Sequence, residues 1–131
     1  MNRFIVLLAS NSEAEKNMEM ARKILILNFP NRILFSENHW SMAVLTEGHE
    51  IEVGENSRYL NAVCAVNTEK DCDSIQLFLK KTESDLGRIR GVEAQGRVAI
   101  DMDLVEWNDV ILRPKDAKQE YYKVCLKELN F

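Results

Sequence analysis

Strand-like and helix-like patterns of apolar residues follow one another along this chain in an order that is compatible with few folds. Continuous or alternating apolar residues predict strands, and apolar residues at spacings of three and four predict helices. The strand patterns cover residues 3–9, 33–35, 59–66 and 98–107, with a short continuation at 109–112. The helical patterns cover residues 12–27, 73–86 and 115–129. The order is therefore strand–helix, strand–strand, helix–strand and a final helix.

Two strand–helix–strand halves, each with a right-handed crossover, combine into one antiparallel sheet. The sequence therefore predicts an α+β fold with the ferredoxin-like arrangement, in which helices cover one face of the sheet. The other face is left for a ligand or a partner. A chain of 131 residues has the length of one domain, so we expect a single domain over residues 1–131. Residues 46–56, which contain two glycines and four glutamates, are expected to form a loop.

Composition excludes several classes of partner. The formal net charge of -4 argues against non-specific binding to nucleic acid, which needs a broad basic surface. No apolar run approaches the roughly 18 residues of a membrane-spanning helix, and the run at residues 4–9 is too short for a signal peptide. We therefore expect a cytoplasmic protein without membrane or nucleic-acid partners, whose three cysteines stay reduced. The oligomeric state is left open.

The strongest local indication of chemistry is Ile100-Asp101-Met102-Asp103-Leu104. Side chains alternate along a strand, so Asp101 and Asp103 share one face, with their backbones about 7 Å apart, while the apolar residues face the helices. Two neighbouring carboxylates repel each other unless a cation lies between them, and such hard oxygen ligands suit Mg²⁺. The pattern predicts a metal site, and the alternative is a strand face that carries solvated acids.

Three arginines precede the acid pair: Arg88, Arg90 and Arg97. They lie in or beside a segment that contains two glycines. A mobile basic loop beside metal-binding carboxylates suits transfer of a polyphosphate group, since arginines neutralise the phosphate oxygens that the metal does not touch. Taken alone, the same residues describe a solvated basic loop. Glu83, at the end of the preceding helix, either accepts a hydrogen bond from a ligand or faces water.

Other polar and aromatic side chains give weaker indications. Asn61 lies on one face of the strand at 59–66, where its amide offers a donor and an acceptor to the edge of a heterocycle. The alternative is a polar residue on a wet sheet face. His39 and His49 have no evident partner and are expected on the surface or in loops. Three aromatic residues are more typical of a core or an interface than of a stacking platform: Trp40, Tyr121 and Tyr122.

These residues occur in an order that resembles the hydroxymethyl-dihydropterin pyrophosphokinase family of folate biosynthesis. The resemblance is carried by Tyr59-Leu60-Asn61-Ala62, Glu83, Gly87-Arg88-Ile89-Arg90 and Asp101-Met102-Asp103-Leu104, and by the spacing from Gly87 to Asp101. The segment Leu8-Ala9-Ser10-Asn11 resembles the family's opening, which has glycine in place of Ala9. The likeness covers most of the chain and is weakest at its ends. The chain thus resembles a short and diverged member with a single pyrophosphokinase-like domain.

The resemblance implies a ferredoxin-like fold and the transfer of the β,γ-pyrophosphate of ATP to the hydroxymethyl group of a dihydropterin. It implies two magnesium ions as cofactors and ATP as co-substrate. The residues that it assigns to the metal ions are Asp101 and Asp103, and those that it assigns to the pterin are Asn61 and Tyr59. The residues that it assigns to catalysis are Arg88 and Arg97. The residues that it assigns to the nucleotide are Glu83, Arg88, Arg90 and Lys115.

This chain also departs from the family's pattern. Residues 40–44 replace an Arg-Thr-Pro-Pro type segment, and residues 91–96 lack the family's loop tryptophan. Arg97 lies one residue further from the acid pair than the family's arginine, and Lys115 stands where the family has histidine. Two alternatives therefore remain. One is a diverged relative that acts on another acceptor, and the other is a non-catalytic ferredoxin-like module that binds a small molecule or a second copy of itself.

Overall fold

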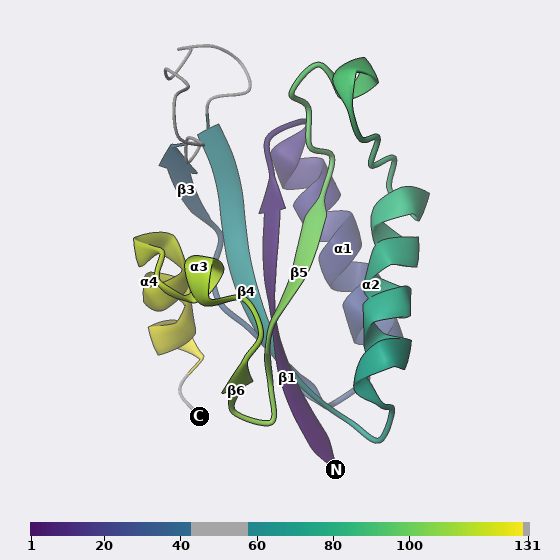
Figure 1. Ribbon diagram of the computed structural model, residues 1–131, viewed down its shortest axis with the longest axis vertical. Helices are drawn as coiled ribbons and strands as arrows, with labels where there is room; N and C mark the ends of the chain where they lie inside the picture. Colours follow the sequence, from purple (N-terminus) through teal and green to yellow (C-terminus); the bar gives the residue numbers. More distant parts are fainter. Residues whose placement is uncertain (43–57, 130–131) are drawn as a thin grey trace.

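The structure is a computed structural model that describes residues 1–42 and 58–129. In these ranges an antiparallel sheet carries helices on both faces (Figure 1). The strands are β1 (Asn2–Ser10), β2 (Ile33–Phe35), β3 (His39–Met42), β4 (Arg58–Thr68), β5 (Asp101–Trp107) and β6 (Val110–Ile111). The helices are α1 (Ala14–Asn28), α2 (Cys72–Asp85), the 3-10 helix η1 (Val92–Ala94), α3 (Pro114–Ala117) and α4 (Glu120–Glu128).

β1 lies at the centre of the sheet, because it pairs with β4 on one side and with β5 on the other. The strand order is β2–β4–β1–β5–β6, with β3 also paired to β4, and these pairs are antiparallel. α1 connects β1 to β2, and α2 connects β4 to β5, so each crossover passes over one intervening strand. This arrangement confirms the predicted α+β fold.

Alternation along the central strands divides the core into two layers. Phe4, Val6 and Leu8 of β1 face α1 and α2, where they pack against the buried faces of both helices. Ile5 and Leu7 face the opposite side of the sheet. The same alternation buries Met102 on the side of α1 and α2, as the sequence predicts.

The C-terminal helix lies on the sheet face that the sequence analysis left open. Tyr122 of α4 is 1% exposed, and its hydroxyl donates to Glu106 Oε1 at 2.9 Å. The prediction that helices cover one face therefore holds for α1 and α2, while α4 covers part of the other face. The physical reason is that both the odd and the even residues of the first strand are apolar, so both faces need cover.

Several element boundaries differ from the sequence prediction. The single helix expected at 115–129 is two helices, because the backbone of Gln119 is extended, with φ -70° and ψ 139°. β5 begins at Asp101 instead of residue 98. α1 begins at Ala14 instead of residue 12, because Glu13 before it adopts a left-handed conformation (φ 42°). β3 was not predicted, because its sequence lacks apolar alternation.

Two further predictions concern cysteines and membranes. Cys64, Cys72 and Cys125 are free thiols, as the sequence predicts. Among the described residues, no helix is long and apolar enough to cross a lipid bilayer. The predicted loop at 46–56 and His49 lie outside the described residues.

Candidate active site

The sheet face that carries α4 also forms one wall of a cleft of about 230 Å³, here called the acidic cleft. A row across its floor consists of Asn61 on β4, Ala9 on β1 and Asp101 on β5, because Ala9 pairs with both of the others. The neighbouring pair along β1 and β5 is Leu7 with Asp103. Strand register therefore brings the predicted amide and both predicted carboxylates together, although they are far apart in the sequence.

Three carboxylates gather at the acidic cleft. One oxygen from each of Glu83, Asp101 and Asp103 lies within 4.8 Å of the others. Burial, and next the charge of Asp101, raises the pKa of Asp103 to about 8. Burial likewise raises the pKa of Glu83. Burial and the neighbouring negative charge both disfavour the ionised forms of Asp103 and Glu83, so a cation at this cluster would be stabilised.

Glu83 is the most buried member of the cluster, with a side chain that is 5% exposed. The Met102 amide donates to Glu83 Oε2 at 2.7 Å, and Arg90 donates to Oε1 at 3.0 Å. Glu83 therefore does not face water, which was one of the two alternatives from the sequence. Because Met102 lies between the two aspartates, Glu83 fixes α2 to the part of β5 that carries them.

The donor set of the cluster suits a hard divalent cation. All three groups are carboxylates, and Mg²⁺ prefers oxygen ligands, of which one or two come from protein and the others from water and phosphate. Asp101 and Asp103 both line the acidic cleft, whereas Glu83 already accepts two hydrogen bonds. The residues present therefore fit Mg²⁺, with the two aspartates toward the cleft and Glu83 behind them.

Two tyrosines line the acidic cleft together with Asn61. Burial, and next the charge of Asp116, raises the pKa of Tyr121 to about 12, and burial also raises the pKa of Tyr59. Both phenols are therefore neutral near pH 7 and can donate hydrogen bonds or contact a planar ligand. The sequence indicated Tyr59 but classed Tyr121 with core and interface residues, because α4 was not expected on this face.

The amide of Asn61 is held by β3. Its Nδ2 lies 2.7 Å from Ser41 Oγ, 3.1 Å from His39 O and 3.3 Å from Tyr59 O. Since these oxygens occupy the donor side of the amide, Oδ1 is the atom left to accept a hydrogen bond from a ligand. Ser41 was not singled out by the sequence, and only the pairing of β3 with β4 could have found it.

His39 has a partner, contrary to the sequence interpretation. Its Nε2 lies 2.6 Å from Glu128 Oε2, and Glu128 Oε1 also accepts a hydrogen bond from the Glu37 amide at 2.9 Å. These contacts attach the end of α4 to β3, which in turn holds Asn61. His39 is thus a structural link near the cleft and not an isolated surface residue.

The predicted basic residues are separated in space. Arg88 lines the acidic cleft, and its Nε is buried without a hydrogen-bond partner among the described residues. Arg90 is bound to Glu83, as described above. Lys115 is exposed on α3 and is not among the residues that line the acidic cleft. Of these three, Arg88 is the one that reaches the cleft directly.

Arg113 is a basic residue of this region that the sequence analysis missed. Its guanidinium lies 3.8 Å from Asp103 and contacts Asp116, and this second contact is the main cause of its raised pKa. Arg113 lines a second cavity of about 310 Å³, the edge cavity, which runs between α2 and β5. The lining residues are Gln76, Leu79, Lys80, Met102, Asp103, Leu104, Leu112 and Arg113. Asp103 belongs to both cavities, so the two adjoin at the acid pair.

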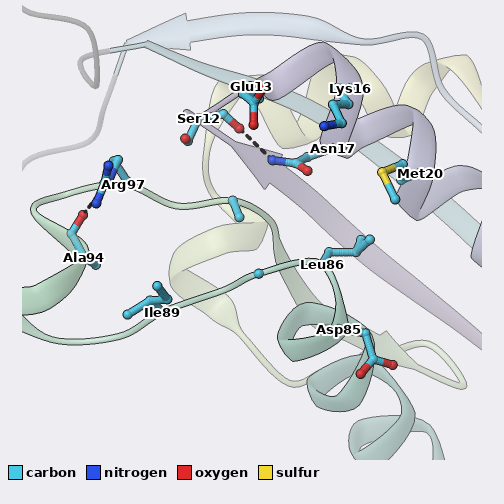
Figure 2. Close-up of a pocket in the computed structure, with 12 residues that line it drawn as sticks. Ser12, Glu13, Lys16, Asn17, Met20, Asp85, Leu86, Ile89, Ala94 and Arg97 are labelled. Carbon is cyan, nitrogen blue, oxygen red and sulfur yellow. Dashed lines mark hydrogen bonds between the residues drawn. The ribbon is translucent and has the colours of Figure 1, made fainter.

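Arg97 lies away from the acid pair. It lines a third cavity of about 480 Å³, the back pocket, together with the start of α1 and the end of α2 (Figure 2). Its Nε donates to Ala94 O at 3.1 Å. Val98 lines the acidic cleft instead. The backbone bends at Ala99, so the alternation of β5 does not extend back to Arg97.

One comparison with known proteins identifies the family of the chain. The profile of the 7,8-dihydro-6-hydroxymethylpterin-pyrophosphokinase (HPPK) family matches residues 5–130, which is nearly the whole chain. A search of curated protein sequences gives no match.

Proposed function

The chain belongs to the 7,8-dihydro-6-hydroxymethylpterin-pyrophosphokinase family, and we propose that it transfers pyrophosphate from ATP to the hydroxymethyl group of a dihydropterin, with Mg²⁺ as cofactor. Family membership makes it a transferase of the pterin pyrophosphokinase type and disfavours the non-catalytic alternative. The observation that carries the proposal is the carboxylate cluster, where a cleft lined by aromatic and amide groups meets a cavity lined by cations.

The acidic cleft is the proposed pterin site. Tyr59 and Tyr121 supply aromatic surface for a planar ring, and Asn61 Oδ1 accepts a hydrogen bond from an N–H at its edge. Ala9 forms the floor between Asn61 and Asp101, where a larger side chain would fill the space. In this orientation the hydroxymethyl group would lie toward the acid pair.

The edge cavity is the proposed ATP site. Its apolar walls suit a purine, the Gln76 amide suits the polar edge of the base, and Lys80 and Arg113 supply positive charge for phosphates. Arg88 approaches the same acid pair from the side of the acidic cleft. Arg90 and Lys115 are the remaining nucleotide candidates, and Arg97 joins them only after the segment at 88–97 rearranges.

The reaction needs alignment and charge neutralisation more than covalent chemistry from the protein. The hydroxymethyl oxygen bonds to the β-phosphorus, the bond between the α-phosphate and the β-phosphorus breaks, AMP leaves, and the hydroxyl proton passes to solvent. Bound Mg²⁺, which we propose as two ions on Asp101 and Asp103, supplies charge neutralisation for the phosphates. Arg88 and Arg113 neutralise phosphate oxygens, and Tyr59 and Asn61 hold the acceptor in place.

The test is product identity in an assay with ATP, Mg²⁺ and the dihydropterin. Pyrophosphate transfer releases AMP, whereas phosphate transfer releases ADP. We expect AMP from the native protein, and at least a 100-fold loss for Asp101→Asn and Asp103→Asn. Asp73→Asn, an exposed change on α2, is the matched control and keeps full activity. The proposal is contradicted if AMP forms equally well without Mg²⁺, or if both Asp101→Asn and Asp103→Asn keep the native rate.

A second candidate is transfer to a different acceptor. The observation that favours it is β3, whose Trp40 and Ser41 replace the family's usual segment beside Asn61. A set of heterocyclic alcohols in the same assay distinguishes the two, because an altered acceptor gives AMP with another alcohol and little with the dihydropterin.

A further inference from the structure

Beyond the end of the β1–β5 ladder, the backbone and the side chain of Asn11 together continue the pairing. The last paired residues are Ala9 and Asp101. The backbone N–H of Asn11 donates to Val98 O at 3.0 Å, and the backbone N–H of Val98 donates to Asn11 Oδ1 at 2.6 Å. Asn11 Nδ2 donates to Gly96 O at 2.9 Å. A side-chain amide carries both the donor and the acceptor of a peptide group, so Asn11 holds the backbone on both sides of Arg97.

Ser10 and Asn11 are buried, whereas much of the segment that they anchor is exposed. Asn11 is 7% exposed and Ser10 is fully buried, with its Oγ donating to Ala99 O at 2.6 Å. At the other end, the Arg88 amide donates to Glu83 O at 3.0 Å. Residues 89–93 between the two anchors are exposed. The lid segment, defined here as residues 88–97, is therefore fixed at its ends and free of packing along much of its length.

We propose that Asn11 is a positioning residue for the transfer reaction, because it fixes the C-terminal hinge of the lid segment relative to the acid pair. This inference rests on the proposed function. Its bonds hold residues 96 and 98, on either side of Arg97. Val98 lines the acidic cleft, whereas Arg97 lines the back pocket (Figure 2). Asn11 lines neither cavity, so it acts through the lid segment and not by touching a substrate.

The physical consequence is a separation of binding from catalysis. The lid segment contributes no lining residue to the edge cavity and only Arg88 to the acidic cleft, so most binding contacts for ATP and the pterin survive when the hinge loosens. Without Asn11, the hinge samples more backbone conformations, so the arginines of the lid segment contact the phosphates for a smaller fraction of the time. Loss of Asn11 thus lowers kcat while leaving KM nearly unchanged.

The direct measurement is amide hydrogen exchange at Val98 by NMR in the protein without ligand. Asn11→Ala removes the acceptor, so exchange at Val98 accelerates at least tenfold. Asn11→Asp keeps that acceptor and loses the bond to Gly96 O, so Val98 stays protected in this variant. If the amide of Val98 exchanges at the same rate in the native protein and in Asn11→Ala, the inference is overturned.

Steady-state kinetics provide the second measurement. We expect kcat to fall about tenfold in Asn11→Ala and less in Asn11→Asp, with both KM values within about threefold of native, since each lost hydrogen bond has a modest net effect. Asn28→Ala is the matched control, because Asn28 also bonds a backbone carbonyl, that of Ile24, far along α1. Unchanged kcat in both Asn11 variants, a change confined to KM, or loss of folding in both overturns the inference. A native protein that forms no AMP refutes the proposed function instead, and the exchange measurement still tests the hinge.

Discussion

Asn61 is a buried amide whose orientation is set by its neighbours on β3. Its Nδ2 faces three oxygens, and the shortest contact is with Ser41 Oγ at 2.7 Å. A ligand in the acidic cleft therefore meets an acceptor at this point. This makes Ser41 a residue that influences which heterocycle edge the cleft binds, although its own role is to hold another side chain.

We predict that Ser41→Ala raises the KM for the acceptor about threefold to tenfold and leaves kcat nearly unchanged. The reason is that one hydrogen bond of about 0.5–1.5 kcal/mol no longer fixes the Asn61 amide. Ser41→Thr keeps the hydroxyl and is the control. Initial rates at varied acceptor concentration check this prediction, and an unchanged KM in Ser41→Ala contradicts it.

The raised pKa of Asp103 has a consequence for how stability depends on pH. Its pKa is raised to about 8 by burial and by Asp101, whereas an unfolded aspartate titrates near about 3.9. Between these values the folded state binds more protons than the unfolded state, so the free energy of unfolding falls as pH rises. Asp71 and Glu128, whose pKa values are lowered, titrate below most of this window.

We therefore predict that the metal-free protein loses stability from about pH 5 to pH 8, and that Mg²⁺ reverses part of this loss, because metal binding favours the ionised carboxylates. Urea denaturation at several pH values, with and without Mg²⁺, measures the slope. Asp103→Asn is the control and shows a flatter slope with no response to Mg²⁺. A native slope equal to that of the variant contradicts the prediction.

At the scale of elements, α4 closes the second layer of the core and brings Tyr121 to the cleft. Tyr122 and Cys125 are buried against β1, β4 and β5, while Val124 on the same helix is 38% exposed. The helix is short, so its stability depends on this packing and not on its intrinsic propensity.

We predict that Tyr122→Ala lowers the free energy of unfolding by about 3 kcal/mol or more, because it opens a cavity and leaves Glu106 without its hydrogen bond. Val124→Ala is the matched control, with a change below about 0.5 kcal/mol. Chemical denaturation of both variants measures the difference, and similar values for the two would show that α4 is not part of the core.

At the scale of the whole molecule, the sheet separates two regions that the lid segment connects. α4 lies on one face of the sheet, and α1 and α2 lie on the other (Figure 1). The acidic cleft is lined from the side of α4, and the back pocket from the ends of α1 and α2. The lid segment passes between them, with Arg88 toward the cleft and Arg97 toward the back pocket. Movement of this segment therefore changes both regions at once.

We predict that residues 88–96 exchange amide hydrogens rapidly in the free protein and slow at least tenfold with Mg²⁺ and a non-hydrolysable ATP analogue. Residues 89–93 are exposed, and two glycines lower the cost of rearranging the segment when an anion binds. The same ligands stabilise the fold by about 2.7 kcal/mol at 100 times Kd. Asp101→Asn is the comparison, and slowing that persists without the acid pair contradicts a metal-dependent closure.

The sequence by itself determined the alternation of the strands and the helical periods, because both are set by neighbours along the chain. Ile100 to Leu104 shows this most clearly, since its alternation correctly placed Met102 in the core and both aspartates on the other face. The order of the helices and strands is compatible with few sheet topologies, and the predicted α+β fold is confirmed.

Tertiary structure alone decided which distant residues meet. The pairing of Ala9 with both Asn61 and Asp101 depends on strand register, which no local pattern specifies. Arg113 and Tyr121 reach the site because the chain after β5 crosses to the second sheet face, and Arg97 misses the acidic cleft because the backbone bends just before β5. These contacts join residues far apart in sequence, and their energies depend on packing across the sheet instead of on the period of any one segment.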